Sequence, residues 1–211
     1  MIATILGAFR VADIRKKILF TALVLALYRL GTHIPAPGIN TAAVNQIEQN
    51  FGGSNILGFL NLLSGGGLGR IAIFALGIMP YITSSIIIQL LQTVIPKFEQ
   101  WREQGAVGQR KRTQATRYLT VALAVMQSSG LVFLFHSGQL FGSGSNIDLI
   151  PDFTAPRVLF IILVFTAGTA VVMWLAELIT QRGIGNGMSI LIFSNVVAAM
   201  PTYGREIQQD K

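Results

Sequence analysis

The stretch SGGGLGRIAIFALGIMPYITSSIIIQLLQ, residues 64–92, decides the fold of this 211-residue chain. It opens with three consecutive glycines and continues as a long apolar run that contains Pro80 and a Thr-Ser-Ser cluster at 83–85. Glycine and proline are poor helix formers in water. We expect Pro80 to free a backbone carbonyl and to bend or loosen the helix around it.

The composition of the whole chain indicates a membrane protein. Hydrophobic residues make up 52% of the sequence and charged residues 12%, whereas a soluble domain carries about 25% charged residues. The mean hydropathy is +0.59. Cysteine is absent, which excludes disulfides and cysteine-based metal sites within these residues.

Four apolar segments approach the roughly 20 residues that a membrane-spanning helix needs, and a fifth, 188–200, does so if its helix begins near Ile184. Buried helices of a large soluble core are disfavoured, because the apolar runs are long and the charges are few. We therefore predict an all-α integral membrane protein with five transmembrane helices in a membrane region spanning 18–200. The expected spans lie at about 18–34, 71–95, 118–135, 158–179 and 184–200.

Lys and Arg residues gather before the first span, between the second and third spans, and at Arg182. Basic residues favour the cytoplasmic side, so we expect a cytoplasmic N-terminus and an external tail at 201–211. Residues 1–17 contain no evident cleavable signal peptide and are typical of an amphipathic segment at the membrane surface; a frayed terminus is the alternative. Membrane orientation therefore accounts for the net charge of +7, and nucleic-acid binding is not required to explain it.

Two connections carry further information. The short apolar piece NILGFLNLLSGGGLG, 55–69, cannot span a membrane, and we interpret it as a helix that folds back into the bundle on a flexible glycine tether; an outer-surface helix is the alternative. The glycine-rich turn at 183–187 predicts a close approach of two helices rather than a phosphate site.

Catalytic and ion-coupling groups are not evident within the apolar runs. Glu177 is the one acidic residue there, and we expect it to cap a helix or to extend to the membrane surface, as Arg29 can at the other end. A secondary transporter would need a midplane charge or binding cluster, and a membrane-embedded enzyme a catalytic pair. A small-solute transporter remains the alternative function, and a pure assembly scaffold is a further one.

Two pairs of bulky apolar residues share a helical spacing of four: Ile78 with Ile82, and Met188 with Ile192. Two helices could present them at a similar depth, where apolar side chains close a pore by excluding water. Packing or lipid contact explains the spacing equally simply, and spacing alone favours that interpretation.

Several long motifs together closely resemble the SecY family, the channel subunits of the bacterial and plastid protein translocase. The resemblance runs from about Ile14 to Met200 and rests on IPAPGI (34–39), LNLLSGGGLGR (60–70), IFALGIMPYITSSIIIQLL (73–91), TRYLT (116–120) and MWLAELITQRGIGNGMSILIF (173–193).

The resemblance implies a fold of ten helices in two halves that face each other like a clamshell, of which this chain would be the first half. A short re-entrant plug helix would lie at about 55–67 and comprise Asn55, Ile56, Leu57, Phe59, Leu60, Asn61, Leu62, Leu63, Ser64, Gly65, Gly66 and Gly67. The pore ring would take Ile78, Ile82, Met188 and Ile192, although the family more commonly has isoleucine at the position of Met188. One wall of a lateral gate would hold Pro80, Thr83, Ser84, Ile87 and Gln127.

The implied function is passage of unfolded secretory polypeptides across the membrane, with lateral release of transmembrane segments into lipid. The resemblance implies no enzymatic activity and no cofactor. Expected partners are SecE and SecG, the SecA ATPase or a translating ribosome, signal sequences with the nascent chains that carry them, and membrane lipid, without specific nucleic-acid recognition. The expected location is the bacterial inner membrane, or a thylakoid membrane in a cyanobacterium or plastid.

Overall fold

A computed structural model of the chain describes residues 11–39, 61–137 and 153–209. The predicted all-α class is confirmed for these residues, which form helices and no strand; a single bridge joins Pro35 to Ala72. The helices are α2 (Ala12–His33), α5 (Met79–Val94), α6 (Pro96–Glu103), α7 (Gly105–Ser137), α8 (Ala155–Arg182) and α9 (Gly187–Gln209).

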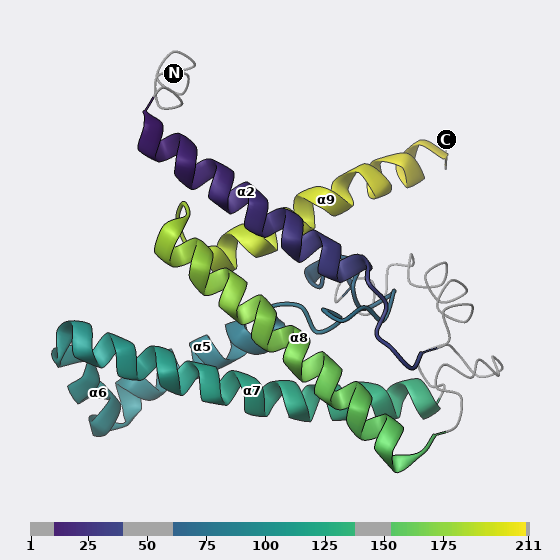
Figure 1. Cartoon of the computed structure of the whole chain (residues 1–211). Coiled ribbons are helices and arrows are strands. Elements are labelled where there is room, and N and C mark those ends of the chain that lie inside the picture. The colour runs from purple at the N-terminus through teal and green to yellow at the C-terminus, as the bar shows by residue number, and fades with distance from the viewer. Residues whose placement is uncertain (1–10, 40–60, 138–152, 210–211) are drawn as a thin grey trace.

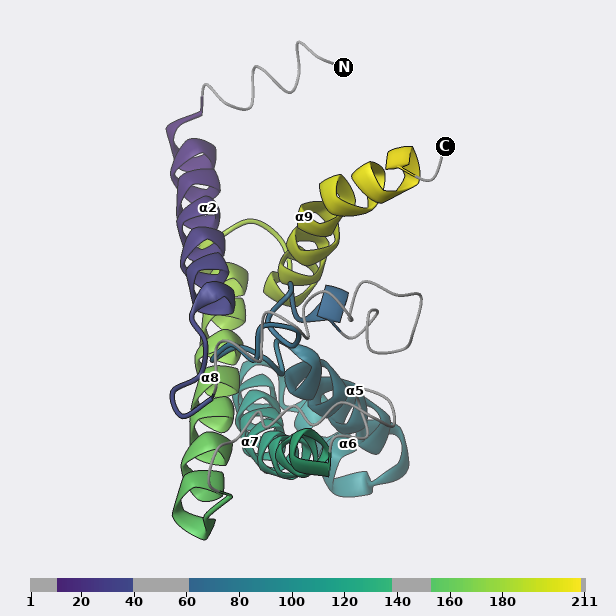
Figure 2. The same ribbon diagram turned by 90° about the vertical axis from the view of Figure 1, so that its right-hand side faces the viewer.

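Helices α2 and α8 lie side by side in both views, and α9 leads away from them after a tight turn (Figures 1 and 2). The long helix α7 crosses α8, and α5 and the short α6 pack along it. Two helices, Gly105–His136 and Ala155–Arg182, are long and apolar enough to cross a membrane, and the apolar part of α9, Gly187–Ala198, is shorter. The count of five spans therefore stays a prediction.

The predicted second span is wrong at its start. Residues 64–78 form turns, and α5 begins only at Met79. The backbone of this irregular stretch pairs with the chain after α2: Ala36 N donates to Ile71 O at 2.9 Å, and Ile73 N donates to Ile34 O at 3.0 Å. The chain turns at Gly77, where φ is +57°, a conformation that a side chain disfavours.

The expected loosening of a helix around Pro80 is also wrong. Pro80 lies in the first turn of α5, where a backbone N–H has no partner within the helix and proline is well tolerated. The same arrangement starts α6 and α8, which also carry a proline in the first turn. Pro80 therefore helps to begin the helix after the irregular stretch.

Helices α7 and α9 exceed the spans expected from hydropathy. Helix α7 begins at Gly105, well before Tyr118, and α9 continues to Gln209, past residue 200. The amphiphilic start of α7 packs on α6, and Gly108 lets the two helices meet, since a Cβ there would lie 1.6 Å from Trp101 O.

Two apolar clusters hold the helices together. One joins the turn stretch to α7 and α8 and consists of Ala36, Leu68, Ile71, Ala75, Leu76, Val132, Phe135, Ile161 and Phe165. The second, which we call the junction cluster, joins α2, the start of α5, α8 and the start of α9. Its buried members are Val24, Tyr28, Phe74, Ile78, Val172, Leu175, Ala176, Ile179 and Leu191.

Candidate functional site

The structure brings the four predicted ring residues to the junction cluster. Ile78 is one of its buried members, and Ile82, Met188 and Ile192 pack against it while remaining partly exposed. Ile82 N donates to Ile78 O at 3.1 Å, so these two residues stand one helical turn apart as expected. The assignment of the four side chains as a pore ring stays a prediction.

The start of α9 is positioned by α8 and by the turn that joins the two helices. Thr180 Oγ1 accepts a hydrogen bond from Gly187 N at 2.9 Å, and Asn186 Oδ1 accepts one from Met188 N at 3.0 Å. A Cβ on Gly187 would lie 1.9 Å from Ala176 O. The close helix approach predicted at the glycine-rich turn 183–187 is therefore confirmed.

The predicted plug is only partly within the described residues: Asn55, Ile56, Leu57, Phe59 and Leu60 lie outside them. Residues 61–63 are helical, and the glycines that follow form hydrogen-bonded turns in place of the expected flexible tether. Gly65 N donates to Leu62 O at 3.0 Å, and Gly66 N donates to Asn61 O at 2.8 Å. Both glycines have positive φ, +69° and +85°, which the turns require. We call residues 61–67 the glycine turn.

The predicted gate-wall residues lie on α5 and α7, which pack together. Pro80 and Ser84 are buried, and Ser84 Oγ donates to Pro80 O at 2.7 Å. Thr83, Ile87 and Gln127 are partly buried. Their proposed gating role stays a prediction.

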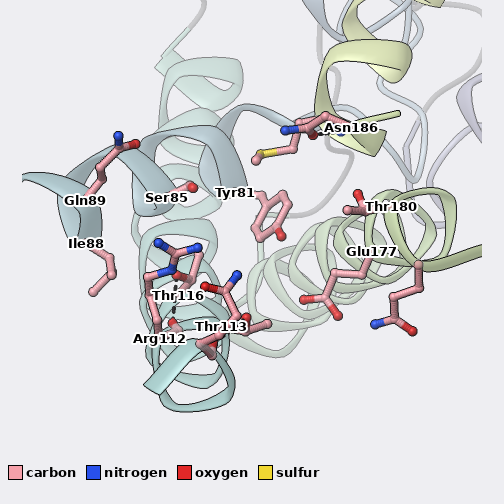
Figure 3. A pocket seen from close by; sticks show the side chains of 13 residues that line it. Tyr81, Ser85, Ile88, Gln89, Arg112, Thr113, Thr116, Glu177, Thr180 and Asn186 are labelled. Atoms are coloured by element: carbon pink, nitrogen blue, oxygen red, sulfur yellow. Dashed lines mark hydrogen bonds between the residues drawn. The ribbon is translucent and has the colours of Figure 1, made fainter. Parts of the chain in front are cut away.

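A cavity of about 560 Å³ opens between α5, α7, α8 and the start of α9 (Figure 3). Sequence reasoning did not anticipate it. Most of its lining is neutral and capable of hydrogen bonding, as in Tyr81, Gln109, Thr113 and Asn186, and Met188 of the predicted ring also lines it. The cavity therefore reaches the junction cluster from the end of the bundle where α8 ends and α9 begins.

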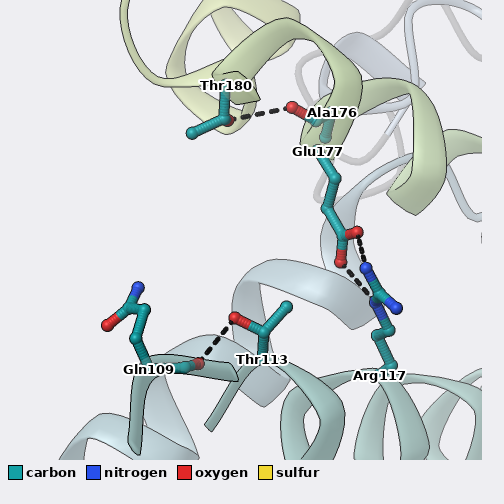
Figure 4. A network of polar contacts seen from close by, with 6 residues as sticks. All are labelled: Gln109, Thr113, Arg117, Ala176, Glu177 and Thr180. Atoms are coloured by element: carbon teal, nitrogen blue, oxygen red, sulfur yellow. Dashed lines mark hydrogen bonds and ion pairs between the residues drawn. The ribbon is translucent and has the colours of Figure 1, made fainter. Parts of the chain in front are cut away.

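Glu177 lies at the edge of this cavity and forms a bidentate ion pair with Arg117 (Figure 4). Arg117 Nε donates to Glu177 Oε1 at 2.8 Å, and Arg117 Nη2 donates to Glu177 Oε2. The Glu177 side chain is 8% exposed, so the expectation that it caps a helix or extends to the membrane surface is wrong. The hydropathy pattern assigned Arg117 to the loop before the third expected span, so the sequence did not indicate its ion pair with Glu177.

We expect the Arg117–Glu177 pair to couple α7 to α8. In a double-mutant cycle with Arg117→Ala and Glu177→Ala, the coupling free energy should be about 1 kcal/mol, because Arg117 is half exposed and solvent screens the pair. Thermal unfolding of the full-length protein in detergent measures it. Arg110→Ala combined with Glu177→Ala is the matched control, since Arg110 is exposed on the same helix; additive effects in both cycles would contradict the coupling.

Three polar residues that sequence reasoning did not assign to the site contact the glycine turn: Tyr28, Arg29 and Asn195. Asn195 is fully buried although it lies in the apolar part of α9. The sequence feature that could have indicated this contact is a single amide within an apolar run, because an amide is costly to bury without hydrogen-bond partners.

Comparison with known proteins now places the chain. The family model described as SecY matches residues 72–209. The chain belongs to the SecY family. The protein translocase subunit SecY of Streptomyces scabiei is 52% identical to it over 204 residues, which cover 96% of this chain and 47% of that protein. The SecY subunit of Mycobacterium tuberculosis is 46% identical over 214 residues, with 100% and 48% coverage.

Solved structures support the SecY fold. A structure titled "The structure of a protein conducting channel" matches with a TM-score of 0.58 at 19% identity, over 88% of this chain and 37% of the other. Sec61 in the canine ribosome–channel complex from the endoplasmic reticulum matches with the same values. The chain spans about half the length of the curated SecY relatives it matches.

Proposed function

We propose that this chain forms the N-terminal half of the central subunit of a protein-conducting channel. The complete channel would pass unfolded secretory polypeptides across a membrane and release transmembrane segments sideways into lipid. The names of its relatives, protein translocase subunits and protein-conducting channels, support this function. In this proposal the channel itself catalyses no covalent reaction.

One observation carries the proposal: two helix starts deliver four bulky apolar side chains to one cluster beside the glycine turn. Ile82, Met188 and Ile192 are partly exposed, so these side chains can face a second half of the channel. Apolar side chains at a constriction exclude water and ions and yield to a passing chain. Methionine at 188 suits such a seal because its side chain is flexible and apolar.

The start of α5 supports a gate wall. Because the preceding residues 64–78 form turns, α5 is not continuous with a longer rigid helix. We propose that α5 and α7 move as one wall against the second half, with Thr83, Ile87 and Gln127 at its surface. The cavity beside Glu177 would then lie on the cytoplasmic side, as the distribution of basic residues predicts.

The proposed partners are SecE and SecG, the SecA ATPase or a translating ribosome, and the signal sequences of exported chains. One structural relative is Sec61 in a ribosome–channel complex. The proposed location is the inner membrane of a bacterium, or a thylakoid membrane, with a cytoplasmic N-terminus.

Site-specific crosslinking tests the channel proposal. The chain contains no cysteine, so Ile82→Cys can be placed in a full-length protein freed of any other cysteine. A stalled secretory precursor that carries one cysteine should form a disulfide with the thiol introduced by Ile82→Cys, and the crosslink should depend on the precursor's signal sequence.

The matched control is Leu23→Cys on the exposed face of α2, away from the junction cluster. We expect no crosslink there. Equal crosslinking at both positions, or none at position 82 while translocation proceeds, would contradict the proposed path.

A further inference from the structure

Three side chains hold three consecutive carbonyl groups of the glycine turn. Asn195 Nδ2 donates to Leu63 O at 2.7 Å, Tyr28 Oη donates to Ser64 O at 3.4 Å, and Arg29 Nη1 donates to Gly65 O at 2.7 Å. Asn195 Nδ2 also donates to Tyr28 Oη at 3.0 Å, which links α9 to α2. The glycine turn is thus tied to two helices that are far apart in the sequence.

These hydrogen bonds are costly to lose because two of the side chains that form them are buried. Tyr28 and Asn195 are fully buried, and the Tyr28 ring stacks on Phe74 with 5.9 Å between ring centroids. A buried carbonyl or amide that loses its partner costs far more than an exposed one. Releasing the glycine turn would therefore expose several unpaired polar groups at once.

The amide orientation of Asn195 is settled by its partners, because Leu63 O can only accept a hydrogen bond. That orientation leaves Asn195 Oδ1 buried and, among the described residues, without a hydrogen-bond partner. A Cβ built on Gly65 would lie 2.6 Å from Asn195 Oδ1 and 2.8 Å from Arg29 Nη1. The unpaired acceptor and the guanidinium therefore flank the same point beside Gly65.

We propose that Tyr28, Arg29 and Asn195 form a latch that holds the glycine turn, the described end of the predicted plug, in the closed position. When the turn leaves, Arg29 exchanges Gly65 O for Asn195 Oδ1. This exchange gives the guanidinium and the amide oxygen a partner in the open state, which lowers the cost of releasing the turn. The inference rests on the proposed channel function and deepens it by naming the residues that set the closed position.

The latch also explains glycine at position 65. Its φ of +69° disfavours any side chain, and a Cβ would collide with both Asn195 and Arg29. The turn can approach the two latch side chains only without a side chain of its own.

The latch is tested in the full-length protein, reconstituted in vesicles, with a reporter Leu62→Cys beside the latched carbonyls. The measured quantity is the rate of labelling by a membrane-impermeant maleimide. Asn195→Ala removes the donor to Leu63 O and should raise this rate about three- to tenfold, since one buried hydrogen bond to the glycine turn is lost. Tyr28→Phe keeps the ring on Phe74 and should raise the rate by a smaller factor.

The exchange of Arg29 is tested by Asn195→Asp. A carboxylate cannot donate to Leu63 O and binds Arg29 strongly, so labelling should exceed that of Asn195→Ala. With Arg29→Gln added to both variants, Asn195→Asp and Asn195→Ala should label at the same rate, because the carboxylate has then lost the guanidinium that it binds. If Asn195→Asp labels no faster than Asn195→Ala, the exchange is refuted.

Val196→Ala is the control, because Val196 is the exposed neighbour of Asn195 on α9. If Tyr28→Phe and Asn195→Ala both label at the rate of Val196→Ala, the latch is refuted. Crosslinking through Ile82→Cys separates this outcome from failure of the channel proposal. A signal-dependent crosslink together with unchanged labelling would contradict the latch proposal alone. Absence of the crosslink in the protein without latch substitutions would contradict the channel proposal.

Discussion

Ile82→Asn in the full-length protein is expected to make the resting channel leak ions. Ile82 packs against the junction cluster while remaining partly exposed. A polar side chain there would let water enter the proposed constriction without leaving a cavity in the buried core. Losing an apolar side chain of this size changes the cost of wetting by about 1.5–3 kcal/mol. A lowering of the permeation barrier by that amount corresponds to roughly a tenfold or greater increase in leak. Conductance of planar bilayers that contain the purified complex measures it.

Position 82 is preferable to position 78 for this test. Ile78 is only 1% exposed and belongs to the buried cluster, so a polar replacement there would damage folding as well as the seal. Leu90→Asn serves as the control, because Leu90 lies two turns further along α5 and is 61% exposed. If the Ile82→Asn variant causes no increase in ion conductance, or if both variants increase it equally, the assignment of Ile82 to the pore ring is wrong.

The family and the all-helical class could be predicted from the sequence because both depend on long local signals. Each of the five apolar segments overlaps a helix of the structure, and the SecY resemblance is confirmed over most of the chain. The start of α5 could not be located in the same way. Residues 71–76 are apolar because they are buried in turns between α2, α7 and α8, and hydropathy alone cannot distinguish a buried turn from a helix.

The candidate site was predicted unevenly for a related reason. Each pair of predicted ring residues follows a spacing within one helix, which a sequence displays directly, and the SecY resemblance supplied their assignment. The ion pair between Arg117 and Glu177 joins residues 60 positions apart, and the contact of Asn195 with Leu63 spans 132 positions. Such pairings depend on how α7 crosses α8 and how α9 meets the glycine turn, which no local pattern encodes.

A large loss of stability is expected for Gly168→Ala in α8. A Cβ at this position would lie 2.1 Å from Ile73 O and 3.0 Å from Ile73 C. Because the obstructing atoms are backbone, no side-chain rotation relieves the clash, and either α8 or the turn stretch must move. Overpacking of this kind costs typically 1–3 kcal/mol, and we expect about 3 kcal/mol here. Thermal unfolding of the full-length protein in detergent measures the loss.

Gly130→Ala is the matched control for this substitution. Gly130 also lies in the interior of a long apolar helix, α7, but no atom lies within 4 Å of the position that its Cβ would take. Alanine is the better helix former, so the control variant should be unchanged or more stable by up to about 1 kcal/mol. Opposite signs for the two glycines would establish that the turn stretch before α5 packs against α8 through backbone contact. If Gly168→Ala were as stable as the parent protein, that packing would be wrong.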